Sequence, residues 1–467
     1  MTTTWTQTSD GHYMRAIGAN EHFIKFVGDR AHPAGREQWS VTVTATMKIP
    51  DTISTIKYAE ILRDAWKLLR FEHPNIASTA EEPEGFGAVL HYVVPNAAEL
   101  DDWLSETLSI VEDSSLSPED VIATLKPQKF VSLHFLPHHS QIILHTAHWR
   151  IDGYGAFYLL NAFFYAIKEI LDNNGLPSLP WGNETARLVA SLETALDLPE
   201  EDTQDVIDAA RQYINTQILM KDSIGIPYIG DVNQKPGGTR SVTMEIAQDL
   251  TDSLEVASKQ HGVGLFSACH AALAAIHFSS SSTPSNAIQH YGSTIRLNMR
   301  PYLLPPYNTS AGACSIYTGG YRLQVPSTQS FIDTAKQYWR EYEEGVSEIF
   351  LRSRRQFALI ILEGLRKGVP VANPPPSNID ISIVDNAEAI LSSTLNTKAG
   401  PLEILNVNLG IETLTRQPYL FLWKFRGKLN LSLWYNEKYQ DRKVALEALK
   451  SICQALTRGL GLKTQSE

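Results

Sequence analysis

The sequence predicts an α/β protein of the α+β type with two lobes. Three observations support this prediction. The chain has 467 residues, more than a single domain usually holds. Segments with strand-like and helix-like periodicity are mixed along its whole length. A stretch rich in glycine and proline, 224–239, separates two series of such segments. We therefore expect an N-terminal lobe at 1–200, a connection at 201–240 and a C-terminal lobe at 241–467.

The elements of the first lobe follow from their periodicity. Valine and alanine alternate with threonine in 39–48, which is typical of a strand, and apolar residues recur at helical spacing in 53–69. Two apolar runs flank Pro137-His138-His139-Ser140 and predict an antiparallel hairpin. The further predicted elements are a strand at 88–94, helices at 97–108 and 120–125, the two hairpin strands at 130–136 and 141–147, and a helix at 156–171.

The second lobe is predicted by the same criteria. The segment 265–278 is apolar on all sides, which indicates a buried helix, and 419–426 and 428–434 flank Arg426-Gly427 as a second hairpin. The remaining predictions are helices at 204–218, 250–261, 331–350 and 444–460, and strands at 241–246, 288–297, 379–384 and 406–411.

Composition excludes several classes of protein. The 43% hydrophobic and 19% charged content is typical of a globular chain, and the formal net charge of −11 argues against general nucleic-acid binding. Three widely spaced cysteines predict neither a zinc site nor a disulfide framework. The N-terminus lacks the features of a signal peptide, and no apolar run is long enough to span a membrane. We therefore expect a cytoplasmic protein with no metal and no membrane partner.

The segment with the clearest chemical meaning is His148-Trp149-Arg150-Ile151-Asp152-Gly153. It follows the apolar strand pattern of 141–147 and precedes a helical pattern. Histidine is the side chain best suited to proton transfer near neutral pH, and a strand end followed by a tight turn holds such a side chain at a cleft. The alternative is a histidine in the core, with Asp152 capping the next helix.

Three later segments carry unusual polar residues within strand-like runs. The segment 292–303 contains Asn298 and Arg300 just before Pro301, and 380–385 reads Asp-Ile-Ser-Ile-Val-Asp with Ser382 at its centre. The third is 423–436, which ends in Trp-Tyr-Asn.

Taken in order, the H-x-x-x-D-G motif, the N-M-R-P-Y-L segment at 298–303, the I-S-I-V-D segment at 381–385 and the C-terminal hairpin resemble the CoA-dependent acyltransferase superfamily. That superfamily also contains the condensation domains of peptide synthetases and the plant alcohol acyltransferases. Within it, the chain is most similar to the fungal alcohol acetyltransferases of secondary metabolism, the trichothecene 15-O-acetyltransferase-like group. The resemblance spans nearly the whole chain.

The resemblance implies two condensation-domain-like lobes that form a tunnel, each with a mostly antiparallel or mixed sheet flanked by helices. It also implies acetyl-CoA or another acyl-CoA as co-substrate, no resident cofactor, and a small alcohol such as a terpenoid or alkaloid as acceptor. It also implies a monomer, because the tunnel lies within one chain.

The resemblance also assigns roles to residues of the motif. His148 is the general base, and Asp152 pairs with an arginine, Arg300 in the first place and Arg296 in the second. Gly153 leaves room for the channel, because a Cβ there would crowd it. Ser382, Asn298 and Arg300 are the residues that we expect to bind acyl-CoA, with Ser382 and Asn298 as hydrogen-bond donors near the thioester.

Two departures from the superfamily refine the prediction. Condensation domains have two adjacent histidines where this chain has Ala147 before His148, which favours a stand-alone acyltransferase. The D-F-G-W-G segment of the plant enzymes has no match. Three alternatives stay open: N-acylation in place of O-acylation, a condensation or cyclisation enzyme with a carrier-protein donor, and a module that only binds CoA or a metabolite.

Overall fold

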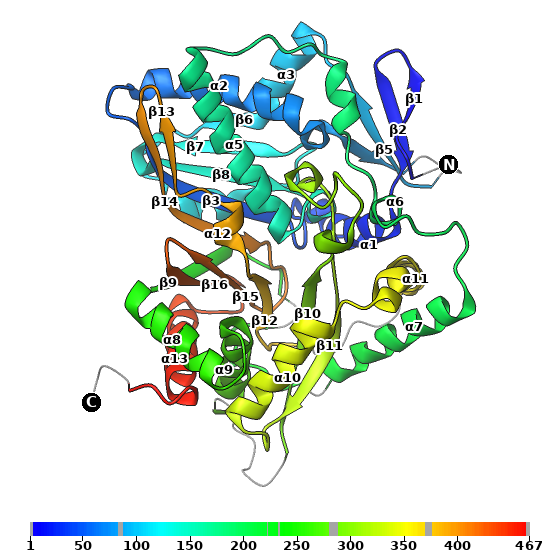
Figure 1. Cartoon of the computed structure of the whole chain (residues 1–467), viewed down its shortest axis with the longest axis vertical. Coiled ribbons are helices and arrows are strands. Elements are labelled where there is room, and N and C mark those ends of the chain that lie inside the picture. The colour runs from blue at the N-terminus through cyan, green and yellow to red at the C-terminus, as the bar shows by residue number, and fades with distance from the viewer. Residues whose placement is uncertain are drawn as a thin grey trace. The chain divides into compact units, whose positions relative to one another are not determined.

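The computed structural model describes residues 3–82, 87–221, 223–231, 234–279, 288–368 and 376–463. They form an α/β protein with helices and sheets mixed along the chain (Figure 1). The chain divides into two compact units, each built from separate stretches of sequence. Unit 1 contains 1–200, 300–317 and 387–409, and unit 2 contains 201–299, 318–386 and 410–467. The predicted lobes were continuous in sequence, whereas 300–317 and 387–409 pack with the N-terminal part of the chain.

Unit 1 contains a six-stranded sheet in the order β13-β14-β3-β8-β7-β6 and a four-stranded sheet in the order β1-β2-β5-β4. Its strands are β1 (Thr6–Ser9), β2 (His12–Ala16), β3 (Val41–Lys48), β4 (Thr79–Glu81), β5 (Val89–Val93), β6 (Leu108–Ile110), β7 (Ser132–Leu136), β8 (Gln141–Thr146), β13 (Thr394–Thr397) and β14 (Gly400–Ile411). Its helices are α1 (Ala19–Asp29), α2 (Thr55–Glu72), α3 (Ala97–Thr107), α4 (Pro118–Thr124), α5 (Gly153–Asn173), α6 (Leu192–Ala195) and α12 (Ala387–Ile390).

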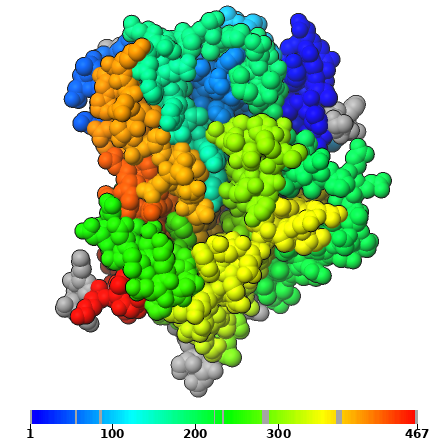
Figure 2. Space-filling view, in the orientation of Figure 1, coloured from blue at the N-terminus to red at the C-terminus, as the bar shows by residue number. Residues whose placement is uncertain are grey.

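The hairpin of β7 and β8 is the element that delivers the motif histidine. Its strands pair antiparallel across the turn at Pro137–His139, as predicted. Strand β8 also pairs with β3, whose threonines at 42 and 44 are buried because β3 lies inside the sheet between β8 and β14. Helices α2 and α5 pack against each other, and α5 also contacts β3 and β13. Figure 2 shows the orange atoms of 387–409 against the teal atoms of α5.

Unit 2 contains a four-stranded sheet in the order β12-β15-β16-β9 and a two-stranded ribbon of β10 and β11. Its strands are β9 (Thr239–Ile246), β10 (His290–Asn298), β11 (Thr318–Pro326), β12 (Asp380–Val384), β15 (Tyr419–Phe425) and β16 (Lys428–Asn436). Its helices are α7 (Gln204–Asn215), α8 (Gln248–Gln260), α9 (Leu265–Ser279), α10 (Phe331–Glu344), α11 (Glu348–Arg366) and α13 (Arg442–Gly459).

Helix α9 lies at the centre of unit 2, because α8, α10 and α13 all contact it (Figure 1). Nearly all of its side chains are buried, as its apolar sequence predicted. Within the described residues, no single helix is long and apolar enough to cross a membrane. Helices α8 and α9 meet that length and composition only as a pair bent by 92°.

One predicted helix is wrong. The expected single helix at 331–350 is two helices, because α10 ends at Glu344 with Gly345 as its C-terminal cap, and Ser347 caps the start of α11. The Ser347 hydroxyl accepts a hydrogen bond from the amide of Phe350, which fixes the new start. Strand β11 was not predicted, because its polar residues and two glycines weaken the apolar alternation.

Gly410 offers a test of the packing in unit 2. A Cβ at this position would lie 1.9 Å from Cε2 and 2.1 Å from Cδ2 of the buried Trp434 indole. We expect Gly410→Ala to lower the free energy of unfolding by about 1–3 kcal/mol through overpacking, measured by urea titration. In a Trp434→Leu background the same change should have little effect, and an equal penalty in both backgrounds would contradict the assigned contact.

Candidate active site

His148 lies directly after β8, in the short helix η4 (His148–Arg150), and its side chain is half-buried. Its Nδ1 lies 2.8 Å from the carbonyl oxygen of Ile151. A carbonyl oxygen can only accept, so Nδ1 is the donor and carries the proton. In the neutral ring Nε2 then holds the lone pair. The turn therefore fixes the tautomer in which Nε2 can take a proton.

Arg150 holds this turn in place from inside unit 1. Its guanidinium donates to the Thr146 hydroxyl at 2.7 Å and to the carbonyl oxygens of Ser78 and Lys129, both at 2.9 Å. It also lies 4.3 Å from the centroid of the Trp149 ring. Burial lowers the pKa of Arg150 to about 10. No role was predicted for Arg150 from the sequence, because a single sequence does not show which carbonyls a buried guanidinium will reach.

Asp152 is the N-terminal cap of α5, and only 1% of its side chain is exposed. Its Oδ1 accepts the amide of Gly155 at 2.8 Å, and its Oδ2 accepts the amide of Tyr317 at 2.8 Å. One guanidinium nitrogen of Arg300, Nη1, lies 2.9 Å from both carboxylate oxygens. The predicted pairing of Asp152 with Arg300 is therefore confirmed.

The second choice of partner, Arg296, is wrong, because Arg296 belongs to unit 2 and pairs there with Asp380.

Arg300 lies in the short helix η7 (Arg300–Tyr302) and is only 2% exposed. Besides Asp152, its guanidinium donates to the carbonyl of Gly312 at 3.2 Å. The rings of Tyr317 and Tyr158 lie 5.4 and 5.9 Å from it. These contacts place Arg300 as a fixed partner of Asp152 within unit 1, and the expectation that it also binds acyl-CoA stays a prediction.

The glycine that the packing of this motif requires most clearly is Gly155. A Cβ on Gly155 would lie 2.2 Å from the carbonyl oxygen of Ala313 and 3.1 Å from Nη2 of Arg300. Gly155 therefore lets α5 approach the 300–317 segment closely enough for the ion pair to form. Gly153, to which the sequence analysis gave the role of spacer, is the first residue of α5 and is half-buried. The sequence feature that could have predicted this close approach is the second glycine, Gly155, two residues after the end of the motif.

Asn298 and Ser382 both belong to unit 2 and are half-buried. Asn298 is the last residue of β10, opposite Thr318 on β11. Ser382 lies in the middle of β12, where it pairs with Phe421 of β15. Their expected roles as donors toward the thioester stay predictions.

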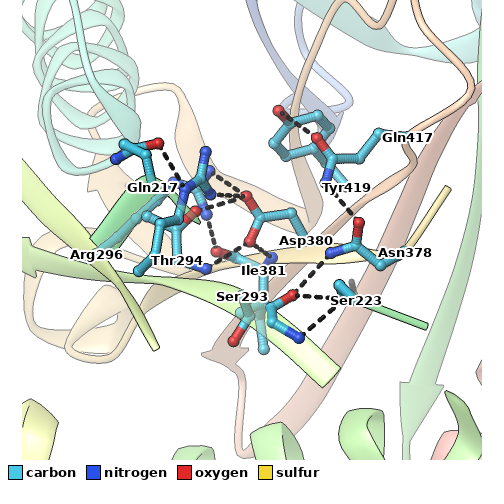
Figure 3. Close-up of polar contacts among 12 residues, drawn as sticks. Gln217, Ser223, Ser293, Thr294, Arg296, Asn378, Asp380, Ile381, Gln417 and Tyr419 are labelled. Atoms are coloured by element: carbon cyan, nitrogen blue, oxygen red, sulfur yellow. Dashed lines mark hydrogen bonds and ion pairs between the residues drawn. The ribbon is translucent and has the colours of Figure 1, made fainter. Parts of the chain in front are cut away.

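Unit 2 contains a buried aspartate, Asp380, for which no role was predicted from the sequence (Figure 3). Arg296 and Arg322 each donate to it, at 2.9 and 3.1 Å. Burial alone would raise the pKa of the Asp380 carboxyl, but the two guanidiniums outweigh burial and hold it well below its usual range. The carboxylate is therefore charged wherever the protein is folded near neutral pH.

Among the described residues, one group could offer three ligand atoms to a metal ion: Asp29, His32 and Glu37. It lies at the end of α1 and in the turn that follows, and Lys25 pairs with Asp29. The group contains none of the predicted site residues.

The Asp152–Arg300 pair can be tested by removing the cation alone. We expect Arg300→Met to lower the free energy of unfolding by about 3–5 kcal/mol, because the carboxylate stays buried without a cation. Arg211→Met, which breaks an exposed pair with Asp208, is the matched control and should change stability by less than about 1 kcal/mol. Equal effects of the two substitutions in urea titrations would refute the assigned role of the pair.

His145 should make stability depend on pH. Burial, with smaller contributions from His134 and Arg36, lowers the pKa of His145 to about 3, and its Nδ1 lies 3.0 Å from the Thr42 hydroxyl. The unfolded chain takes up a proton at this position below about pH 6.5, whereas the folded chain stays neutral down to about pH 3. The stabilisation is therefore complete above pH 6.5 and is lost as the pH falls from 6.5 toward 3.

We expect His145→Gln to reduce the slope of unfolding free energy against pH, between pH 6 and 4.5, by up to about 1.4 kcal/mol per pH unit. His138→Gln, at an exposed position in the hairpin turn, is the control that should leave the slope unchanged. The same slope in wild type and His145→Gln would rule out a neutral, buried His145.

The chain was compared with known proteins. No protein-family model matches it. It is 43% identical over 460 residues to "Acetyltransferase pigO" of Monascus ruber, with 98% of each chain covered. It is 29% identical over 466 residues to "O-acetyltransferase pigM" of the same organism, with 98% of this chain and 88% of the relative covered.

Among solved structures, the trichothecene 15-O-acetyltransferase TRI3 of Fusarium sporotrichioides superposes with a TM-score of 0.80 at 14% identity, over 97% of each chain. A condensation domain of a peptide synthetase shares the fold. The predicted fold is therefore confirmed by the structural neighbours, and the predicted family by the sequence relatives. The chain is an acyltransferase with a condensation-domain-like fold, and it belongs to the family of fungal acetyltransferases that includes pigO.

Proposed function

We propose that this protein is an acetyl-CoA-dependent O-acetyltransferase that acts on a hydroxyl group of a small secondary metabolite, with His148 as the general base. The names of the relatives support the transfer of an acetyl group, and pigM and TRI3 are both named O-acetyltransferases. The trichothecene in the name of TRI3 supports a secondary metabolite as acceptor. The observation that carries the proposal is the hydrogen bond from Nδ1 of His148 to the Ile151 carbonyl.

The first step is removal of a proton from the acceptor. With Nδ1 committed to the Ile151 carbonyl, the lone pair on Nε2 accepts the proton of the acceptor hydroxyl as its oxygen attacks the thioester carbonyl carbon. The carbonyl π electrons move to oxygen, and a tetrahedral intermediate forms. The imidazolium keeps its Nδ1–H···O=C bond, so the ring does not turn during the transfer.

The second step is collapse of the intermediate. The C–S bond breaks, the thiolate of CoA leaves, and the Nε2 proton of His148 passes to the sulfur. The products are the acetyl ester and CoA with a free thiol, and the histidine is neutral again. The same side chain acts first as base and then as acid. The route needs neither a metal nor a covalent acetyl-enzyme.

Asp152 has a structural role in this mechanism. Its carboxylate accepts the amides of Gly155 and Tyr317 and the guanidinium of Arg300, and these donors orient both of its oxygens. The backbone carbonyl of Ile151, rather than this carboxylate, orients the imidazole. Gly153 starts the helix that Asp152 caps, and a Cβ there would narrow the space for the substrates.

We further propose that Ser382 and Asn298 of unit 2 act as hydrogen-bond donors toward the thioester. A hydroxyl and an amide are the neutral donors that stabilise an oxyanion without binding it as a permanent ion. Both side chains are half-buried; Ser382 is the central residue of β12, and Asn298 is the last residue of β10. Removal of one such donor slows acyl transfer by about a hundred- to a thousandfold in other enzymes.

The test is the rate of CoA thiol release with acetyl-CoA and a panel of hydroxylated metabolites. We expect His148→Ala to lower kcat by about 10²- to 10⁴-fold, because the attacking hydroxyl loses its base. His138→Ala is the matched control, because His138 lies exposed in the hairpin that precedes the motif. Both variants should keep the melting temperature of the wild type.

A folded His148→Ala variant with unchanged turnover would contradict the mechanism. Mass spectrometry of the product identifies the acetylated atom, and acetylation of an amine in place of a hydroxyl would contradict the O-transfer. Intact-protein mass spectra during turnover should show no covalently acetylated chain.

A further inference from the structure

We propose that Arg296 and Arg322 of unit 2 form a binding site for an anionic group of a substrate, a phosphate of acyl-CoA in preference to a carboxylate of the acceptor. The inference rests on the proposed function for the identity of the ligand. Its structural basis is independent of His148 and lies in the network around Asp380 (Figure 3).

Three strands bring the network together. Thr294 and Arg296 lie two residues apart on β10, so their side chains share a face. Arg322 on β11 pairs directly opposite Thr294. Asp380 is the first residue of β12, and it reaches the amide of Thr294 at 2.9 Å. Arg296 also donates to the carbonyl of Ile381 on β12.

The carboxylate of Asp380 has its full set of donors. Its Oδ1 accepts the amides of Thr294 and Ile381, at 2.9 and 3.0 Å. Its Oδ2 accepts the Thr294 hydroxyl at 2.7 Å and the two guanidiniums. Asp380 is 0% exposed, so it serves as an internal anchor that fixes the position of both arginines.

The charges of this cluster do not cancel. One carboxylate faces two guanidiniums, which leaves one positive charge in a chain whose formal net charge is −11. Arg354 adds a second uncompensated cation nearby, because it is buried and donates to the carbonyl of Gly320, the residue opposite Arg296. A cluster with excess positive charge in a partly buried position raises the local concentration of anions.

Both arginines keep donors for a ligand. The side chains of Arg296 and Arg322 are 29% and 20% exposed. Arg322 uses Nη1 for Asp380 and Nε for Gln217, and Arg296 uses its two terminal nitrogens for Asp380 and Ile381. Within the described residues, Nη2 of Arg322 and Nε of Arg296 have no protein acceptor. Guanidinium groups held in place in this way suit the oxygens of a phosphate.

The other basic run of unit 2, at 352–355, is less suited to this role. Arg355 pairs with Asp202 at 2.6 Å, and Arg352 with Glu348 at 3.7 Å. Arg354 is enclosed by the rings of Phe350 and Phe357. Arg352 and Arg355 thus each have a carboxylate of their own, and Arg354 is only 2% exposed, whereas the two partly exposed arginines on Asp380 share a single carboxylate.

Acyl-CoA is the ligand class that this chemistry fits best. It carries phosphate groups far from its reacting thioester, and an uncharged alcohol acceptor offers no counterpart to a guanidinium. An acceptor with a carboxylate is the other source of an anion. Substitution of the arginines distinguishes these two ligands, because only the substrate that supplies the anion should bind more weakly to the variants.

The experiment is calorimetric titration of the full chain with CoA, 3′-dephospho-CoA and pantetheine. In Arg322→Gln and Arg296→Gln we expect the affinity for CoA to fall about 10- to 150-fold, because each variant loses a charge-assisted hydrogen bond to the phosphate. The affinity for pantetheine, which lacks the nucleotide phosphates, should not change. Arg211→Gln, at an exposed position on α7, is the control and should bind all three compounds as the wild type does.

The titration measures binding and not acetyl transfer. Its result therefore tests the anion site even if the protein does not acetylate a hydroxyl. Loss of affinity for CoA but not for 3′-dephospho-CoA would assign the 3′-phosphate to the site. A tenfold rise in KM for an acceptor carboxylic acid but not for its methyl ester, with CoA binding unchanged, would assign the site to the acceptor.

Unchanged binding and unchanged KM in both variants would overturn the proposal. It would also be overturned by an equal loss of affinity for CoA and pantetheine together with a lower melting temperature, because that result describes a purely structural cluster.

Discussion

The buried carboxylate of Asp152 is the constraint on which the motif depends. A charge with 1% exposure is stable inside a protein only where donors and a cation surround it. Asp152 obtains them from three places in unit 1: the first turn of its own helix, the guanidinium of Arg300 and the amide of Tyr317. The segment 300–317 therefore packs with the N-terminal part of the chain, although nearly 150 residues separate the two in sequence.

The geometry of His148 follows from this anchoring. Asp152 fixes the start of α5, and the chain just before it must turn within η4, where Arg150 binds the carbonyls of Ser78 and Lys129. In that turn the carbonyl of Ile151 comes within 2.8 Å of the imidazole Nδ1. Asp152 therefore affects the imidazole of His148 through the backbone of the turn, in which the Ile151 carbonyl accepts the hydrogen bond from Nδ1.

Much of this arrangement was predictable from the sequence, for identifiable reasons. The strand before His148 and the helix after it have strong periodicity. The resemblance to the acyltransferase superfamily implied an arginine partner for Asp152, in agreement with the need of a buried carboxylate for a cation. Gly155, Arg150 and Asp380 were not predicted, because their roles depend on contacts distant in sequence, with Ala313, Ser78 and Arg322. The break between α10 and α11 was missed because Ser347 caps a helix inside a continuous helical pattern.

Each unit contains a buried aspartate that accepts hydrogen bonds from backbone amides and from arginine. The two aspartates differ in the number of arginines that pair with them. Asp152 has one arginine, which is 2% exposed, so the two charges of the pair balance. Asp380 has two, both largely buried, so one positive charge of the cluster has no carboxylate of its own. A second arginine is not needed to stabilise one carboxylate, and burying its charge opposes folding unless an anion compensates for it. The excess charge at Asp380 is therefore better explained by a bound anion than by the stability of the sheet.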